Sequence, residues 1–198
     1  MRTVSLSGST RSDVGKKDAK RLRNAGMVPC VVYGGEKQVI FSVPEPEFKE
    51  LIFNPNVAFV DLNIDGKVIK AILQDVQYHP VSDAIFHVDF KELIDGKSIV
   101  MGIPVKVTGK SVGVTKGGKS QIKMRKLKVK ALPAFMPENI TLDITHLDVG
   151  NSIRVRDIKV ENIEILDSPN SVAVTINVTR AAAAAAAAAA APVGKGKK

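Results

Sequence analysis

A group of cations near the amino terminus has the composition and spacing of a polyanion-binding site. It comprises Lys16, Lys17, Lys20, Arg21 and Arg23. On a helix, where successive residues are about 100° apart, these side chains fall within an arc of roughly 160°, opposite Ala19, Leu22 and Ala25. No acid stands at i+4 to balance them, so the helix repels itself in isolation and is favoured when phosphates face it. The pattern predicts a nucleic-acid contact. The alternative is a helix face that water alone solvates.

A glycine-rich segment in the second half fits a nucleotide-binding motif by its letters. Residues 113–120 have the spacing of a Walker A loop, with Lys119 placed to reach a phosphate. That motif requires a following helix whose amino terminus points at the phosphates. Residues 126–131 instead alternate lysine with apolar residues, which is the periodicity of a strand. We therefore interpret residues 113–120 as a flexible basic loop between strands. The alternative, a P-loop nucleotidase, predicts ATP hydrolysis that Lys119→Ala abolishes.

His79, His87 and Asp89 superficially form a metal set of two histidines and one carboxylate. No thiolate pair accompanies them, and the third histidine, His146, belongs to the other half of the chain. The sequence also lacks a nucleophile elbow and a dinucleotide fingerprint. We expect no metal, no cofactor and no catalytic residue, and hence a protein that is not an enzyme.

The net charge of +9 is distributed unevenly along the chain. Residues 1–35 carry +5, residues 36–91 carry −4, residues 92–179 carry +4, and the tail from Arg180 adds four cations and no acid. Clustered cations on an otherwise acidic first half indicate a local contact with a polyanion, because neutralising phosphates releases their counterions.

Short strands must position these residues in the first half. The expected helices are residues 16–25, ended by Gly26, and residues 46–53, ended by Pro55. The expected strands are residues 3–7, an edge strand, followed by 30–33, 38–43, 57–64, 68–76 and 85–90. Asp65-Gly66 suits the tight turn of a hairpin between the fourth and fifth strands. Six strands and two short helices in residues 1–91 predict a closed or nearly closed small barrel.

The second half reads as strands almost throughout, so the chain is mainly β. The expected strands are 99–107, 122–131, 140–144, 153–155, 163–166 and 172–178. We predict three parts: a first domain at residues 1–91, an all-β domain at 92–179, and a low-complexity alanine-rich basic tail at 180–198.

Cysteine usage and hydropathy indicate a cytoplasmic protein. Cys30 lies in an apolar run and has no partner for an intramolecular disulfide, which predicts a buried, inert thiol. No segment has the length of a signal peptide core or a membrane span, so we expect no membrane association.

Three ordered motifs carry a family resemblance. Residues 15–35 (GKKDAKRLRNAGMVPCVVYGG) are followed at a distance by residues 74–80 (QDVQYHP) and 87–90 (HVDF). They resemble the bacterial 5S rRNA-binding ribosomal protein family L-twenty-five, in its longer two-domain general-stress (Ctc) form. Residues 133–140 and 143–150 are similar to the second domain of that form. The likeness covers about residues 1–179 and excludes the alanine tail.

The resemblance implies a six-stranded barrel docked on the loop E region of 5S rRNA, in the central protuberance of the large ribosomal subunit. Carried over position by position, the RNA-facing residues are Arg11, Lys16, Lys20, Arg21, Arg23, Tyr33, Gln74, His87 and Asp89. Arginine is common in the family where this chain has Lys20, and lysine lacks the planar fork that holds a phosphate or a guanine edge in two places. Double-stranded RNA is read by phosphate cations together with polar groups in the minor groove, which this set supplies.

The resulting hypothesis is a structural protein of the large ribosomal subunit, ribosome-bound as a monomer. The second domain has 23S rRNA and neighbouring large-subunit proteins as its candidate partners. A further reading makes the chain a stress-induced protein whose second domain is a protein-interaction module and whose ribosome contact is only an anchor. Deleting residues 92–198 and measuring ribosome association would distinguish the two.

Overall fold

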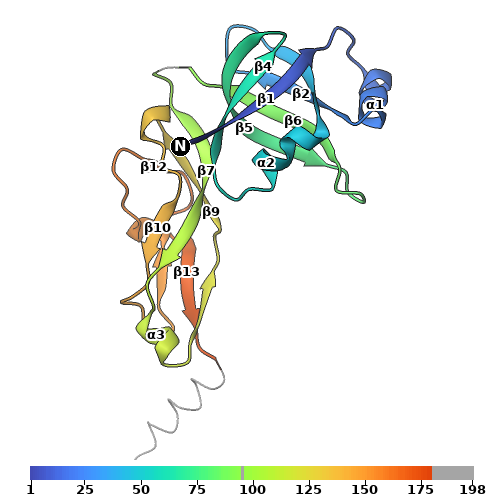
Figure 1. Cartoon of the computed structure of the whole chain (residues 1–198). Coiled ribbons are helices and arrows are strands. Elements are labelled where there is room, and N and C mark those ends of the chain that lie inside the picture. The colour runs from blue at the N-terminus through green and yellow to red at the C-terminus, as the bar shows by residue number, and fades with distance from the viewer. Residues whose placement is uncertain (95, 180–198) are drawn as a thin grey trace, which may run out of the picture. The chain divides into compact units, whose positions relative to one another are not determined.

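The computed structural model describes residues 1–94 and 96–179 and is built mainly of strands (Figure 1). The first half forms a closed barrel with short helices. Its elements are β1 (Arg2–Thr10), α1 (Lys16–Asn24), β2 (Met27–Tyr33), β3 (Val39–Pro44), the 3-10 helix η1 (Glu45–Phe48), α2 (Lys49–Ile52), β4 (Ala58–Ile64), β5 (Lys67–Tyr78) and β6 (Ile85–Glu92). The barrel predicted from the six short strands is thus confirmed.

The barrel closes through its first strand. Its order is β1-β3-β2-β6-β5-β4, with β1 parallel to β4 and antiparallel to β3. The predicted edge strand at residues 3–7 is part of a longer strand that closes the barrel: residues 2–8 pair with β4, and Ser9 and Thr10 pair with β3. Val4 and Leu6 point inward and alternate with exposed residues, a pattern that an edge strand and a barrel strand share. The parallel partner is distant in the chain, so alternation alone could not reveal it.

Alternate residues of the barrel strands fill a single core. Phe90 packs against Phe41 and Phe48, with ring centroids 5.9 Å and 6.5 Å away. Cys30 is fully buried among these apolar side chains, which confirms the predicted buried thiol and raises its pKa through desolvation. This rigid core fixes the directions of the outward-facing side chains on β2, β5 and β6.

The hairpin between β4 and β5 turns at Asp65 and Gly66, as predicted. Their φ angles are 49° and 84°, the left-handed values that a two-residue hairpin turn requires. Glycine adopts such an angle without steric cost, and aspartate tolerates it better than most residues.

The second half consists of two small sheets. Its elements are β7 (Ile99–Thr108), α3 (Val112–Thr115), β8 (Lys119–Ile122), β9 (Lys126–Ala131), η2 (Pro133–Phe135), β10 (Ile140–Asp143), β11 (Ser152–Arg154), η3 (Val155–Asp157), β12 (Glu164–Ile165) and β13 (Val172–Asn177). The sheet orders are β10-β7-β9-β12 and β11-β13-β8. The predicted fold class is confirmed, and the second half departs from an all-β domain only by the short helical turns α3, η2 and η3 among its described residues.

The predicted strand at residues 122–131 begins too early, because only residues 126–131 form one strand, β9, and Ile122 is the last residue of β8 in another sheet. β8 ends at Ile122 and β9 begins at Lys126. The apolar positions change parity between the strands, from even-numbered Ile122 and Met124 to odd-numbered Leu127 and Val129. A continuous strand keeps one parity, so this change indicates the break.

Two compact units are present. Among the described residues, the first comprises Met1–Pro104, Val129–Asn139 and Asn162–Glu164, and the second comprises Val105–Lys128, Ile140–Glu161 and residues 165–179. The division at residues 91 and 92 stays a prediction, and the tail at 180–198 lies outside the described residues. No helix among the described residues has the length and apolar composition that a membrane crossing requires.

Candidate nucleic-acid interface

Helix α1 presents the predicted cations from a well-defined position. Its last carbonyls accept hydrogen bonds from the Ala25 and Gly26 amides, and Gly26 takes the left-handed conformation with φ 76°. Gly26 therefore ends the helix, as the sequence predicted. Ala19 and Leu22 are half-buried, so the apolar side of α1 faces the protein and the opposite side, which carries the cations, faces outward.

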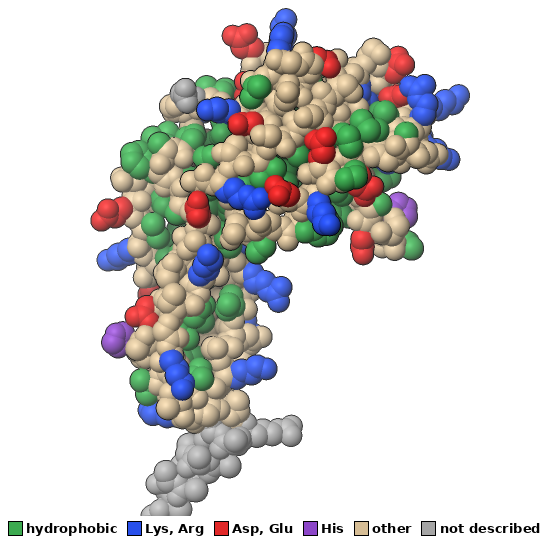
Figure 2. Space-filling model, in the orientation of Figure 1, with side chains coloured by type: hydrophobic (Ala, Val, Ile, Leu, Met, Phe, Trp, Pro, Cys, Tyr) green, Lys and Arg blue, Asp and Glu red, His purple; other side chains and the backbone are tan. Residues whose placement is uncertain are grey.

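Four cations of α1 are exposed and form what we call the α1 cationic face: Lys16, Lys17, Lys20 and Arg21. Figure 2 shows Lys and Arg side chains gathered where α1 lies. The loop before the helix and its first turn line a shallow hollow of about 510 Å³, to which Lys16, Lys17 and Arg21 contribute. Within the described part of the chain, no carboxylate lies within ion-pair distance of the three lysines. Their charge is available to an external anion.

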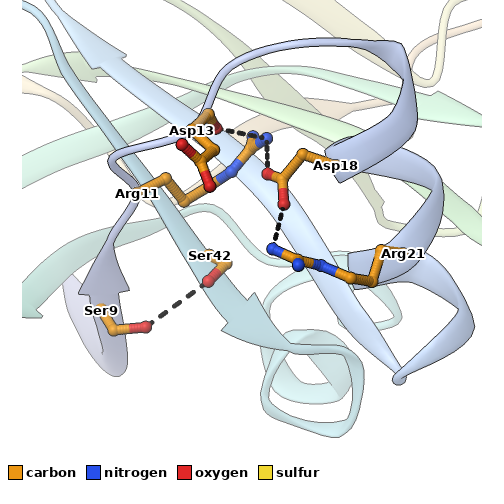
Figure 3. A network of polar contacts seen from close by, with 6 residues as sticks. All are labelled: Ser9, Arg11, Asp13, Asp18, Arg21 and Ser42. Atoms are coloured by element: carbon orange, nitrogen blue, oxygen red, sulfur yellow. Dashed lines mark hydrogen bonds and ion pairs between the residues drawn. The ribbon is translucent and has the colours of Figure 1, made fainter.

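An acid lies within this arrangement, bridging two arginines (Figure 3). Asp18 accepts a hydrogen bond of 2.8 Å from Arg11 and one of 2.7 Å from Arg21. The bond from Arg11 is the main cause that lowers the pKa of the Asp18 carboxyl, and Arg21 lowers it further. Arg21 lies three residues after Asp18, so a search for acids at a spacing of four residues does not find this pair. Arg21 is therefore partly neutralised, while its side chain stays exposed.

Arg11 is directed into the protein. Only 8% of its side chain is exposed, and its guanidinium contacts Asp18 and the Asp13 carbonyl. Its Nε is buried without a hydrogen-bond partner among the described residues. Arg11 thus braces the start of α1 against the loop that precedes it. The geometry does not favour the direct RNA contact that the resemblance implies for this residue.

Arg23 joins α1 to the barrel. Its Nε donates a hydrogen bond of 3.0 Å to the Phe86 carbonyl, and its guanidinium carbon lies 3.3 Å from the centre of the Phe86 ring. Such a stacked cation is held by the ring as well as by the carbonyl. Desolvation lowers the pKa of Arg23, with a smaller contribution from the charge of Arg11. Arg23 is therefore a half-buried connection and only partly a surface cation.

Polar residues continue from this connection along the outside of the barrel. We call Tyr33, Gln74, His87 and Asp89 the barrel strip. Val88 and Phe90 point into the core, so His87 and Asp89 point outward, with 28% and 29% of their side chains exposed. His87 Nδ1 lies 2.7 Å from an Asp89 carboxylate oxygen. Burial, and then the charges of Asp89 and Asp75, raise the pKa of the Tyr33 hydroxyl, which places these groups near one another.

Gln74 reaches the strip because β5 is irregular at this point. Leu73 pairs with Phe90 and Asp75 pairs with Asp89, so Gln74 is an extra residue on β5. A β-bulge of this kind redirects a side chain away from the regular alternation. Gln74 is accordingly exposed, and its amide has the groups both to donate and to accept hydrogen bonds.

The sequence prediction missed three residues that help to form this surface. Asp18 orients Arg21, Asp75 lies opposite Asp89, and Phe86 supports Arg23. All three residues lie within or next to the motifs that carry the family resemblance. Their contacts could not be predicted, because they join segments that are distant in the chain or depend on side-chain rotamers. Only the i,i+3 spacing of Asp18 and Arg21 could have been found beforehand.

The phosphate-loop and metal alternatives gain no support. Helix α3 precedes residues 117–120, and strand β8 begins at Lys119, where a nucleotide-binding loop needs a helix. The flexible loop that we expected at residues 113–120 is therefore only partly present, because these residues include most of α3 and the start of β8. His79 Nδ1 accepts hydrogen bonds from the Val81 and Ser82 amides, and His87 contacts Asp89. Across residues 1–94 and 96–179, no three His, Cys, Asp or Glu side chains are grouped to hold a metal ion.

The surface has two chemical parts that meet at Arg23 and Phe86. The α1 cationic face can neutralise phosphates, and the barrel strip supplies a phenol, an amide, an imidazole and a carboxylate for hydrogen bonds. This combination fits a folded nucleic acid that presents a backbone and a shallow groove together.

Comparison with known proteins gives matches over both units. Residues 6–90 match the ribosomal L25p family, and residues 98–180 match the C-terminal domain of ribosomal protein TL5. The chain is 43% identical over 188 residues to large ribosomal subunit protein bL25 of Phocaeicola vulgatus, covering 91% of this chain and 95% of the relative. It is also 43% identical to the protein of that name from Amoebophilus asiaticus over 198 residues, covering all of both chains.

Proposed function

Because the chain belongs to the ribosomal L25p family, in a form with the TL5 C-terminal domain, we propose that it binds 5S rRNA in the central protuberance. Family membership confirms the prediction of a ribosomal protein of the large subunit and not an enzyme. The finer assignment, to 5S rRNA and to particular residues, is our proposal. The protein acts in the cytoplasm as a ribosome-bound monomer.

The observation that carries the proposal is the exposed α1 cationic face, joined through Arg23 and Phe86 to the barrel strip. Lys16, Lys17, Lys20 and Arg21 neutralise backbone phosphates. Because these contacts carry no sequence information, they set the affinity and the orientation of the RNA.

The barrel strip reads the groove. The minor groove of A-form RNA is wide and shallow, so the edges of its bases and its 2′-hydroxyl groups are accessible. Tyr33 and Gln74 offer donors and acceptors, whereas the Asp89 carboxylate accepts only. A carboxylate repels phosphate but can accept from an amino group of a base, so Asp89 favours the groove over the backbone.

Arg11 and Arg23 have supporting roles in this proposal. Arg11 holds Asp18, which in turn holds Arg21, and its burial argues for positioning in place of direct contact. Arg23 fixes the distance between the helix and the strip through Phe86, and its remaining guanidinium nitrogens face the RNA.

A competition experiment tests the assignment to 5S rRNA. Purified full-length protein is bound to labelled 5S rRNA and challenged with unlabelled 5S rRNA or with transfer RNA. We expect 5S rRNA to compete at a concentration at least about a hundredfold lower than transfer RNA, a conservative bound because specific DNA-binding proteins typically prefer their site by about a thousandfold or more. Equal competition by the two RNAs would show that the surface attracts RNA without selecting 5S rRNA.

A further inference from the structure

The second unit has a sheet face whose composition differs from the rest of the molecule. In the sheet β11-β13-β8, Val174 and Ile176 are buried, whereas Thr175 between them is half-buried and Asn177 is exposed, so Thr175 and Asn177 lie on the outer face. Thr175 lies opposite Ser152 and Gln121, and Asn177 lies opposite Lys119. The Asn177 side-chain nitrogen donates a hydrogen bond of 2.7 Å to the Gln121 side-chain oxygen, which confirms that the two share a face.

This face is hollowed and continues past the end of β8. A depression of about 550 Å³ is lined by Lys123, Met124, Ser152, Ser171, Val172, Thr175 and Asn177. Lys123 therefore belongs to the same surface as Lys119. We call the set Lys119, Gln121, Lys123, Ser152, Thr175 and Asn177 the β8–β13 face. It combines two cations with four neutral hydrogen-bonding groups and no acid.

The absence of acid belongs to a longer pattern. Residues 96–137 contain ten Lys or Arg and no Asp or Glu. The acids of the second unit are mostly engaged elsewhere: Asp148 with Lys116, Asp143 with Thr145, Asp157 with the Arg154 amide and Asp167 with the Lys128 amide. Among the described residues, no carboxylate pairs with Lys119 or Lys123. Figure 2 likewise shows more Lys and Arg than Asp and Glu over the second unit.

We propose that the β8–β13 face is a second RNA-binding site, separate from α1 and the barrel strip, and that it holds a double-stranded RNA backbone. Four residue steps of about 3.3 Å separate Lys119 from Lys123, or about 13 Å, which is too far for both to hold one phosphate. The spacing fits a polyanion. Hydroxyl and amide groups between the lysines match a ribose 2′-hydroxyl, which both donates and accepts.

The composition favours RNA over a protein partner. Protein interfaces concentrate aromatic anchors at their centre and are depleted of lysine, whereas the depression has no aromatic residue in its lining, with Met124 and Val172 as its apolar members, and the face carries two lysines. Lysine on an edge strand such as β8 also discourages pairing with other strands. If Lys119 and Lys123 served only to prevent strand pairing, their replacement would not change RNA affinity. An RNA-binding experiment therefore distinguishes this role from RNA binding.

The test uses full-length protein carrying Lys16→Ala, Lys17→Ala and Lys20→Ala, which weakens the first surface. The double substitution Lys119→Gln and Lys123→Gln is added to this variant. The control adds Lys106→Gln and Lys159→Gln instead, because these two lysines are exposed in the same unit and their replacement removes the same charge. Affinity for a random-sequence RNA duplex and for the matching DNA duplex is measured from about 50 to 200 mM salt.

We expect the Lys119 and Lys123 pair to weaken RNA-duplex binding about tenfold or more near 0.1 M salt and to lower the salt slope by nearly 2. The control pair should have a clearly smaller effect, and the DNA duplex should bind more weakly than the RNA duplex. Equal effects of the two pairs would overturn the site, and equal binding of DNA would overturn its assignment to RNA. Because 5S rRNA binding by the first surface is measured separately, failure here leaves that proposal standing.

Discussion

Replacing three lysines of α1 should change the salt dependence of 5S rRNA binding by a predictable amount. The variant is Lys16→Ala, Lys17→Ala and Lys20→Ala. All three side chains are exposed, and none of them contributes to the Arg11–Asp18–Arg21 network or to the Arg23 contact. Alanine is a strong helix former, so α1 should keep its structure. The loss is therefore one of charge alone.

The magnitude follows from counterion release. Each phosphate contact contributes about 0.7 to 0.9 to the slope of log affinity against log salt, so three contacts contribute about 2 to 3. Over a fourfold change, from about 50 to 200 mM salt, the affinity of the parent should fall about 20- to 40-fold more than that of the variant. Arg23 is left in place because its removal would also disturb Phe86.

A filter-binding or fluorescence titration at four salt concentrations measures both slopes. The matched control is Lys49→Ala, Lys67→Ala and Lys70→Ala, three exposed lysines on other elements of the same unit. The control should keep nearly the parental slope, since its charges lie on α2 and β5. Parallel slopes for the parent and the α1 variant would refute the phosphate contacts of the helix.

Four other changes test separate parts of the structure. Asp18→Asn should flatten the dependence of unfolding free energy on pH: the lowered pKa of Asp18 means that it stabilises the folded state above its ordinary pKa of 3.8 and loses this effect as pH falls through the lower folded value. Chemical denaturation between pH 2 and 6, about the range in which carboxyl groups titrate, should show a smaller difference across that window for the variant than for the parent. Gly8→Ala should cost about 1–3 kcal/mol of stability, because a Cβ there would come within 2.9 Å of Phe41 and of the Ser42 carbonyl; an unchanged melting temperature would contradict this packing. Arg23→Lys keeps the charge but loses the stacked guanidinium, so it should weaken 5S rRNA binding with little change in salt slope. Gln74→Ala should weaken 5S rRNA binding about fivefold, which corresponds to the loss of about one hydrogen bond, and should leave the salt slope unchanged. A reduced salt slope would show instead that Gln74 contacts the phosphate backbone of the RNA.

The elements were largely predictable because their signals are local. Gly26 ends α1, Asp65-Gly66 turns the hairpin, and alternating apolar residues mark most strands. What local patterns could not give was pairing between distant strands. β1 alternates like an edge strand, yet it closes the barrel against β4, because the two strands meet only in three dimensions. The break between β8 and β9 does have a local signal, because the apolar residues change from even-numbered to odd-numbered positions across it.

The site was predictable in its residue types but not in their orientations. Helical spacing identified the exposed lysines, since exposure on a short surface helix follows from the wheel. Arg11 differs, because its direction depends on Asp18, and an arginine looks the same in sequence whether it faces solvent or a carboxylate. Phe86 could not be foreseen as the support of Arg23 for the same reason.

The most direct test of the central claim maps what lies next to α1 in an assembled ribosome. The Lys17→Cys variant is labelled with a hydroxyl-radical probe, a reaction that spares the native thiol because Cys30 is fully buried. Large subunits reconstituted with the labelled protein should show strand cleavage in 5S rRNA, whereas a probe at Lys67→Cys should give weaker cleavage or cleavage elsewhere. Intact 5S rRNA with the probe at position 17, in subunits that contain the protein, would contradict the account.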